Sequence, residues 1–247
     1  CGDEPGYAPF YAARAEILKG ANISQCESDL KKALALDNQW RYHVLLADFY
    51  NEQRLYEKAL SITSPFYTLH PDNFITGSLH AKTLLLNKKY READAVLKKL
   101  NILPHEGATN GREMYREAKL MQALGSMERK RFSEAMKFIA DSRLWPENLG
   151  VGKPYDENID VRLEDWLAYL CQQKLNKPGE AGKMLDKIVS FKPSIENGVR
   201  NFIPANTLIS AWALERLGRK SEASEFIEQQ IKEFQGYRDL TWSRAIF

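Results

Sequence analysis

The sequence lacks long hydrophobic runs and has no excess of either charge. Its 247 residues carry 35 Lys and Arg against 33 Asp and Glu, which gives a formal net charge of +2, and the two signs are interspersed. This balance argues against nucleic acid or an anionic membrane as the main partner. No segment approaches the ~20 consecutive apolar residues of a membrane-spanning helix. The sequence therefore predicts a soluble protein without a transmembrane segment.

Cysteine and histidine are too few and too scattered for a metal site or a disulfide framework. The three cysteines have no metal-type spacing, and their number is odd. None of the four histidines has the i, i+4 partner that places two ligands on one helical face. We expect Cys26 to be a small buried apolar residue and His80 to be a hydrogen-bonded core residue. No metal and no cofactor are predicted.

The sequence also lacks motifs for catalysis. It contains no Gly-x-Ser-x-Gly and no Cys-x-x-Cys segment. His105 and Glu106 begin a zinc-protease-like motif, but Thr109 stands where the second histidine is required. Gly152-Lys153 does not complete a phosphate-binding loop, because Glu147 occupies the position of its first glycine. We therefore predict that the chain is not an enzyme.

The sequence does contain small and aromatic residues that recur about every 34 positions. Small residues at positions 8 and 20 of such a repeat let two antiparallel helices approach closely, and a proline near the end stops the second helix. Counted from Trp40 as position 1, the pattern comprises Leu46, Ala47, Tyr50, Tyr56, Ala59 and Pro71. It resembles the tetratricopeptide repeat (TPR) family. The resemblance implies an all-α fold, an open right-handed superhelix of helical hairpins.

The recurrence of the position-20 residue predicts about six hairpins in a single domain, 1–247. That residue is Cys26, Ala59, Ala93, Ala135, Ala181 and Ala223 in turn, so the spacing grows from 33 or 34 residues to 42 or more. The hairpins are expected at about 7–39, 40–73, 74–107, 112–147, 159–193 and 204–236, with a C-terminal cap over 237–247. A closed ring of hairpins is disfavoured, because the chain is short for one.

Three insertions explain the longer spacing in the second half. They cover 105–111, 148–158 and 194–204, are rich in turn-forming residues, and are expected at one edge of the stack. Within 145–154, two prolines and two glycines favour a stiff connector over a partner-binding loop. In the last hairpin, Gly218 stands where the turn between helices needs a positive φ.

A concave groove is predicted along the first helices of the hairpins. Positions 2, 5, 9 and 12 of those helices point into the groove of a TPR stack. The candidate groove residues are Arg41, Asp48, Asn51, Ser78, Lys82, Trp166 and Trp212. Exposed aromatic residues there favour peptide or sugar contacts. The alternative is that the two tryptophans pack against neighbouring helices.

A second resemblance is carried by three segments: 7–14, 103–115 and 145–154. They resemble the helical C-terminal region of large bacterial proteins that also carry an uncharacterised, mutarotase-like β-sandwich domain. This resemblance implies a bacterial protein with a link to carbohydrate processing, and it implies no catalytic residue in this chain.

Two functions are therefore weighed. The first is a non-catalytic protein-interaction or scaffolding module that presents its groove to a peptide or to a partner domain. That domain can belong to another protein or to the same parent chain. The alternative is an accessory helical domain of a bacterial carbohydrate-active protein that contributes to a sugar-binding site. The compartment, cytoplasmic or periplasmic, stays open. Cys1 followed by Gly2 matches the mature end of a bacterial lipoprotein, and a fragment boundary is the alternative.

Overall fold

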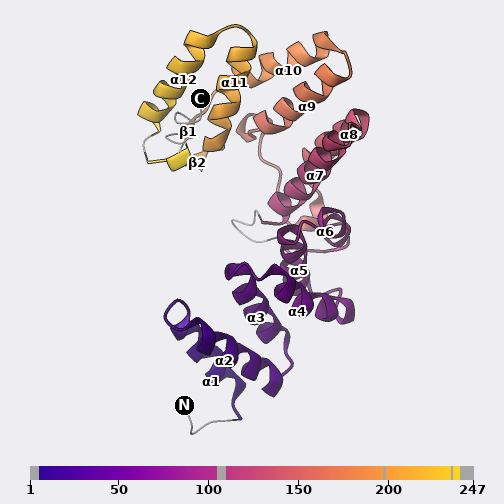
Figure 1. The fold of residues 1–247 in the computed structure, drawn as a ribbon, viewed down its shortest axis with the longest axis vertical. Coiled ribbons are helices and arrows are strands. Elements are labelled where there is room, and N and C mark those ends of the chain that lie inside the picture. Colours follow the sequence, from indigo (N-terminus) through magenta and orange to yellow (C-terminus); the bar gives the residue numbers. More distant parts are fainter. Residues whose placement is uncertain (1–5, 105–109, 197–198, 235, 240–247) are drawn as a thin grey trace. The chain divides into compact units, whose positions relative to one another are not determined.

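The computed structural model describes residues 6–104, 110–196, 199–234 and 236–239, and it consists of helices paired as hairpins (Figure 1). Cys1, His105 and the part of the predicted cap after residue 239 lie outside the described residues. The helices are α1 (Ala8–Leu18), α2 (Ile23–Leu36), α3 (Trp40–Glu52), α4 (Tyr56–Leu69), α5 (Phe74–Leu86), α6 (Tyr90–Leu97), α7 (Asn110–Glu128), α8 (Phe132–Ser142), α9 (Arg162–Lys174), α10 (Pro178–Ser190), α11 (Thr207–Arg216) and α12 (Lys220–Glu233). The predicted all-α class is confirmed.

The chain divides into two compact units. The N-terminal unit contains Cys1–Ala118 and Trp145–Val151, and the C-terminal unit contains Lys119–Leu144 and Gly152–Phe247. Each unit is described below by itself. That the hairpins form one continuous domain stays a prediction.

The small residues of the repeat lie where the helices of a hairpin meet. Ala47 and Ala59 on α3 and α4 have no exposed surface, and Ala81 and Ala93 on α5 and α6 repeat the arrangement. Cys26 on α2 is 2% exposed, and burial raises the pKa of its thiol. It is a buried apolar residue, as predicted. Fully buried alanines leave no gap between the helices, so a larger side chain there would have to displace one of them.

Five hairpins share one turn between their helices. The residue in the turn has a left-handed backbone, with φ between 56° and 59° at Arg54, Lys88, Lys130 and Asn176 and of 79° at Gly218. The next residue donates its N–H to the carbonyl five positions back, over 2.8 to 3.0 Å, as in the Schellman motif that ends many helices. The positive φ predicted at Gly218 is confirmed. The other four turns hold side chains in a conformation that favours glycine.

The segment Trp145–Val151 completes the core of the N-terminal unit. Asn148 donates from Nδ2 to the carbonyl oxygens of Leu97 (3.0 Å) and Leu100 (2.7 Å), and its own carbonyl accepts from the N–H of Ile102 (2.8 Å). Leu149, in a 3-10 turn over Glu147–Leu149, is 1% exposed and lies in the same core cluster as Leu97. The predicted connector therefore also caps the end of α6 and fills the core beside it.

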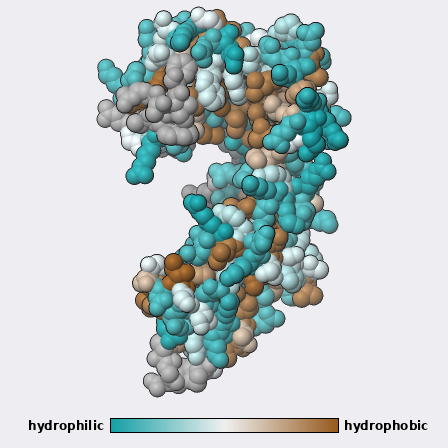
Figure 2. All heavy atoms as spheres, viewed as in Figure 1, coloured by the Kyte–Doolittle hydropathy of each residue, from teal (hydrophilic) through white to brown (hydrophobic). Residues whose placement is uncertain are grey.

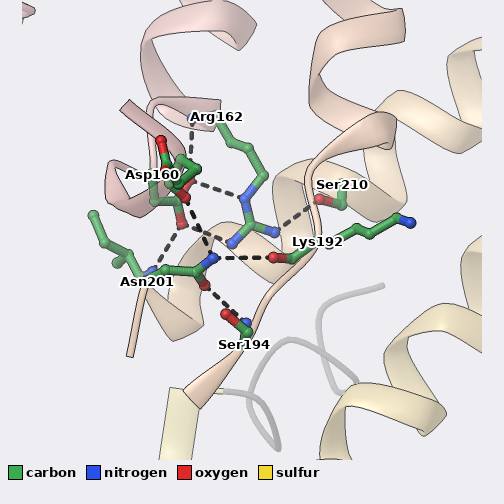
Figure 3. Close-up of polar contacts among 8 residues, drawn as sticks. Asp160, Arg162, Lys192, Ser194, Asn201 and Ser210 are labelled. Carbon is green, nitrogen blue, oxygen red and sulfur yellow. Dashed lines mark hydrogen bonds and ion pairs between the residues drawn. The ribbon is translucent and has the colours of Figure 1, made fainter. Parts of the chain in front are cut away.

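A buried ion pair anchors the insertion before α11 (Figure 3). The Arg162 side chain is 1% exposed and donates to both carboxylate oxygens of Asp160, over 2.9 and 2.7 Å, and to Ser210 Oγ at 2.9 Å. Asp160 Oδ2 also accepts from the N–H of Ile203 at 2.8 Å, and the Phe191 ring lies 4.5 Å from the guanidinium carbon. Because each charge is hydrogen-bonded, the buried pair fixes the insertion against the start of α9.

The same insertion contains a short β-hairpin that the sequence did not predict. Strands β1 (Ile195–Glu196) and β2 (Val199–Arg200) pair antiparallel between α10 and a 3-10 turn at Pro204–Asn206, and another 3-10 turn, at Asp156–Asn158, precedes α9. Asn201 supports it, because its Nδ2 donates to the carbonyl of Lys192 (3.1 Å) and its Oδ1 accepts from the N–H of Ser194 (2.8 Å; Figure 3). Phe202, in the same insertion, packs on Phe234 at the end of α12, with ring centroids 4.6 Å apart.

The shared turn predicts opposite effects for two exchanges of glycine. Lys88→Gly should raise the free energy of unfolding by up to about 1 kcal/mol, because glycine adopts a positive φ without steric cost. Gly218→Ala should lower it by about 1 kcal/mol through backbone strain alone, since nothing lies within 4 Å of the added Cβ. Urea unfolding of both variants measures the two changes. Shifts of the same sign would contradict this account of the turns.

Candidate binding sites

Asp48 on α3 and Lys82 on α5, both candidate groove residues, lie together. Lys82 Nζ is 3.6 Å from Asp48 Oδ1, and both side chains are partly exposed. Burial raises the pKa of the Asp48 carboxyl, while the Lys82 ammonium acts in the opposite direction. Ser78 lies one turn before Lys82 and is half-buried. The first helices of two successive hairpins thus carry a loose ion pair that a ligand can reach.

Two other predicted groove residues have different surroundings. Asn51 is 7% exposed and donates from Nδ2 to Thr83 Oγ1 at 3.0 Å, so it joins α3 to α5 within the packed interior. Arg41 is exposed, and its guanidinium carbon lies 4.9 Å from the centre of the Trp40 ring. We therefore leave Asn51 out of the candidate groove.

A pocket of about 490 Å³ lies beside Asp48, between α1 and α3. Small and apolar side chains form part of its lining, namely Ala12, Ala13, Ala15, Cys26, Leu30, Leu45 and Phe49. Glu16, Lys19, Asp48 and Glu52 supply charged groups, and Lys19 Nζ lies 2.8 Å from Glu52 Oε1. In Figure 2 the visible face of the N-terminal unit likewise shows hydrophobic patches among hydrophilic side chains. We call this site the α1–α3 pocket.

The sequence interpretation missed three of the four charged groups of the α1–α3 pocket. Glu16, Lys19 and Glu52 do not stand at positions 2, 5, 9 or 12 of a first helix. The available signal was the pair of small residues on the first helix, Ala12 and Ala15, which leaves space in front of α3. Their charged neighbours one turn further along α1 border that space.

A second pocket, also of about 490 Å³, lies in the N-terminal unit where loops precede α3 and α5. Its lining combines aromatic and polar side chains: Asn38, Gln39, Trp40, Phe66, Leu69, His70, Pro71, Asp72 and Asn73. The Phe66 ring contacts two histidines in tilted arrangements, with its centroid 4.2 Å from that of His43 and 4.6 Å from that of His70. We call this site the loop pocket.

The C-terminal unit contains the other predicted pair. The rings of Trp166 on α9 and Trp212 on α11 have centroids 5.8 Å apart at an interplanar angle of 33°, and Tyr169 lies 5.1 Å from Trp166. Both tryptophans are half-buried. They pack against each other across α9 and α11, as the alternative interpretation expects, and each keeps part of its surface accessible. That they line a groove stays a prediction.

His80 is part of the packed interior. Its Nδ1 lies 2.9 Å from Thr63 Oγ1, its ring stacks on Tyr67 at 4.9 Å, and burial lowers the pKa of His80 to about 4. The described residues contain no group of three His, Cys, Asp or Glu side chains placed to hold a metal ion. None of the helices described here combines the length and hydrophobicity needed to cross a lipid bilayer.

Comparison with known proteins identifies the fold. No family model and no curated protein matches the chain. Among solved structures, PilW, a widely conserved type IV pilus biogenesis factor, matches with 15% identity and a TM-score of 0.51 over 95% of this chain and 97% of PilW. A tetratricopeptide repeat protein from Parabacteroides merdae matches with 12% identity and a TM-score of 0.50 over 99% and 86%. The chain therefore has the TPR fold.

The lowered pKa of His80 predicts that acid destabilises the protein. Between about pH 6.5 and 4 the unfolded chain binds a proton at this histidine and the folded chain does not, so stability falls as the pH is lowered. His80→Asn should flatten this dependence by up to about 3 kcal/mol over the interval. Urea unfolding at several pH values measures it, and His70→Asn, at an exposed site, is the control. An unchanged slope in His80→Asn would refute the assignment.

Proposed function

We propose that this chain is a non-catalytic protein-interaction or scaffolding module that holds a segment of a partner protein against α1, α3 and α5. The TPR fold of the solved structures that it matches is a fold of such modules. The observation that carries the proposal is the α1–α3 pocket, which lies next to the Asp48–Lys82 ion pair. Together they form a surface with apolar and charged parts on the first helices of three successive hairpins.

The α1–α3 pocket has the properties that a peptide site needs. Its volume of about 490 Å³ is in the range of roughly 300–1,000 Å³ that is usual for ligand pockets. Leu45 and Phe49 offer apolar contact, which supplies most of the affinity, and the charged groups around them fix orientation. Since α1 and α3 belong to packed hairpins, little ordering is needed on binding.

In the C-terminal unit we propose Trp166 and Trp212 as a second contact surface. Tryptophan is enriched among the residues that dominate binding energy, because it combines a large apolar area with one hydrogen-bond donor. Tyr169 supports Trp166 from the same helix.

Removal of the Asp48–Lys82 pair tests the main proposal. Peptides of 12 residues are first selected from a random phage-display library on the purified chain. Asp48→Ala with Lys82→Ala should weaken the selected peptides at least tenfold in a fluorescence titration. The control is Glu180→Ala with Lys183→Ala, which removes an exposed pair of 2.7 Å on α10 and should change nothing.

Three outcomes would argue against this function. The first is a library that yields no binding peptide, the second is unchanged affinity of the selected peptides for the Asp48/Lys82 variant, and the third is an equal loss in both variants. Circular dichroism of each variant confirms that the helices are intact.

A second candidate function is supported by the loop pocket. Sugars are bound in proteins by aromatic rings together with amide and carboxylate groups, and this pocket brings Trp40 and Phe66 next to Asn38, Gln39 and Asp72. We therefore keep, as the alternative, an accessory helical domain of a bacterial carbohydrate-active protein.

Calorimetry with a panel of oligosaccharides separates the two candidates. If the loop pocket binds sugar, one oligosaccharide should give a saturable signal that Trp40→Ala abolishes and Trp166→Ala, in the other unit, retains. No heat with any oligosaccharide would reject the sugar site of this chain.

A further inference from the structure

Acidic side chains outnumber basic ones in the lining of the α1–α3 pocket. Three carboxylates, Glu16, Asp48 and Glu52, line it together with one ammonium, Lys19. Lys19 pairs with Glu52 at 2.8 Å, and Lys82 approaches Asp48 from outside the lining at 3.6 Å. Even with Lys82 included, one negative charge remains in excess. A bound cation would therefore gain more than a bound anion.

The C-terminal ends of α1 and α3 also make the electrostatic potential of the pocket more negative. Glu16 and Lys19 lie at the C-terminal end of α1, and Glu52 is the last residue of α3. The C-terminal end of a helix carries a partial negative charge from unpaired carbonyl groups, which stabilises a nearby cation. Both helices of the pocket thus add to the excess of negative charge.

The apolar part of the pocket limits which cation fits. Leu30, Leu45 and Phe49 line it together with the alanines of α1. A small hydrated ion gains nothing from such a surface. Lysine and arginine side chains do, because their methylene stems bury against apolar groups while the charged end stays near carboxylates and water.

We propose that the α1–α3 pocket binds a lysine or arginine side chain of the partner segment together with an aliphatic residue next to it. The cationic group meets Glu16 and Asp48, and the stem and the aliphatic neighbour pack on Leu45 and Phe49. This proposal rests on the function proposed above and adds the chemical class of the bound segment: a basic, apolar peptide and not an acidic one.

The test uses the full chain and the random 12-residue phage-display library. Selected sequences should be enriched in lysine or arginine next to an aliphatic residue and depleted in aspartate and glutamate. Glu16→Gln with Asp48→Asn keeps both shapes and removes both charges, and should weaken synthetic versions of these peptides at least tenfold. Their affinity should also fall as sodium chloride is raised, because salt screens charge pairs at the protein surface.

The matched control removes two carboxylates elsewhere. Glu180→Gln with Asp186→Asn, both exposed on α10, changes the net charge by the same amount and should leave the affinity unchanged. An equal loss in this control would mean that total charge, and not the pocket, attracts the peptide, and would overturn the proposal.

The remaining outcomes separate this proposal from the function on which it rests. If the selected peptides are acidic or uncharged, yet lose affinity when Asp48 and Lys82 are removed, the groove function stands and the basic specificity is wrong. If basic peptides bind regardless of Glu16 and Asp48, the pocket assignment is wrong. If no peptide is selected at all, both proposals fail.

Discussion

The close approach of two antiparallel helices at alanine-sized residues is the constraint on which the rest of this structure depends. Ala59 lies in one core cluster with residues of α3, Ala81 and Ala93 lie together in another, and none of the three has exposed surface. Because the two helices of a hairpin pack closely, the chain must reverse its direction within a few residues. Five hairpins do so with one residue of left-handed backbone and the same backbone hydrogen bond. The requirement is local, so each hairpin is specified within its own stretch of sequence.

The candidate binding surface consists of side chains that stay exposed after the helices have packed. Ala47 and Ala81 have no exposed surface, whereas the residues that follow them, Asp48 and Lys82, stay partly exposed. Where α1 presents alanines, a space opens in front of α3. The α1–α3 pocket is thus a product of stacking one hairpin on the next, and no single hairpin contains it.

The inserted segments, which are not part of the repeat, make hydrogen bonds that stabilise the helices around them. Asn148 reaches back about 50 positions to cap the end of α6, and the N–H of Ile203 donates to Asp160, the partner of Arg162. Both segments satisfy backbone or charged groups that a bare hairpin stack would leave without partners. The inserted segments therefore complete the packed core, apart from any role in binding.

The sequence by itself determined that the chain forms helical hairpins, that the alanines of the repeat are buried and that Gly218 takes a positive φ. These follow from spacing along helices, which a single periodicity describes. Only the tertiary structure decided that Asn51 is enclosed, that Leu149 enters a core, that Asp160 and Arg162 are buried, and that Glu16, Lys19 and Glu52 join the pocket. Such contacts unite residues from different helices and loops, and the geometry that brings them together is set by packing and not by any repeat in the chain.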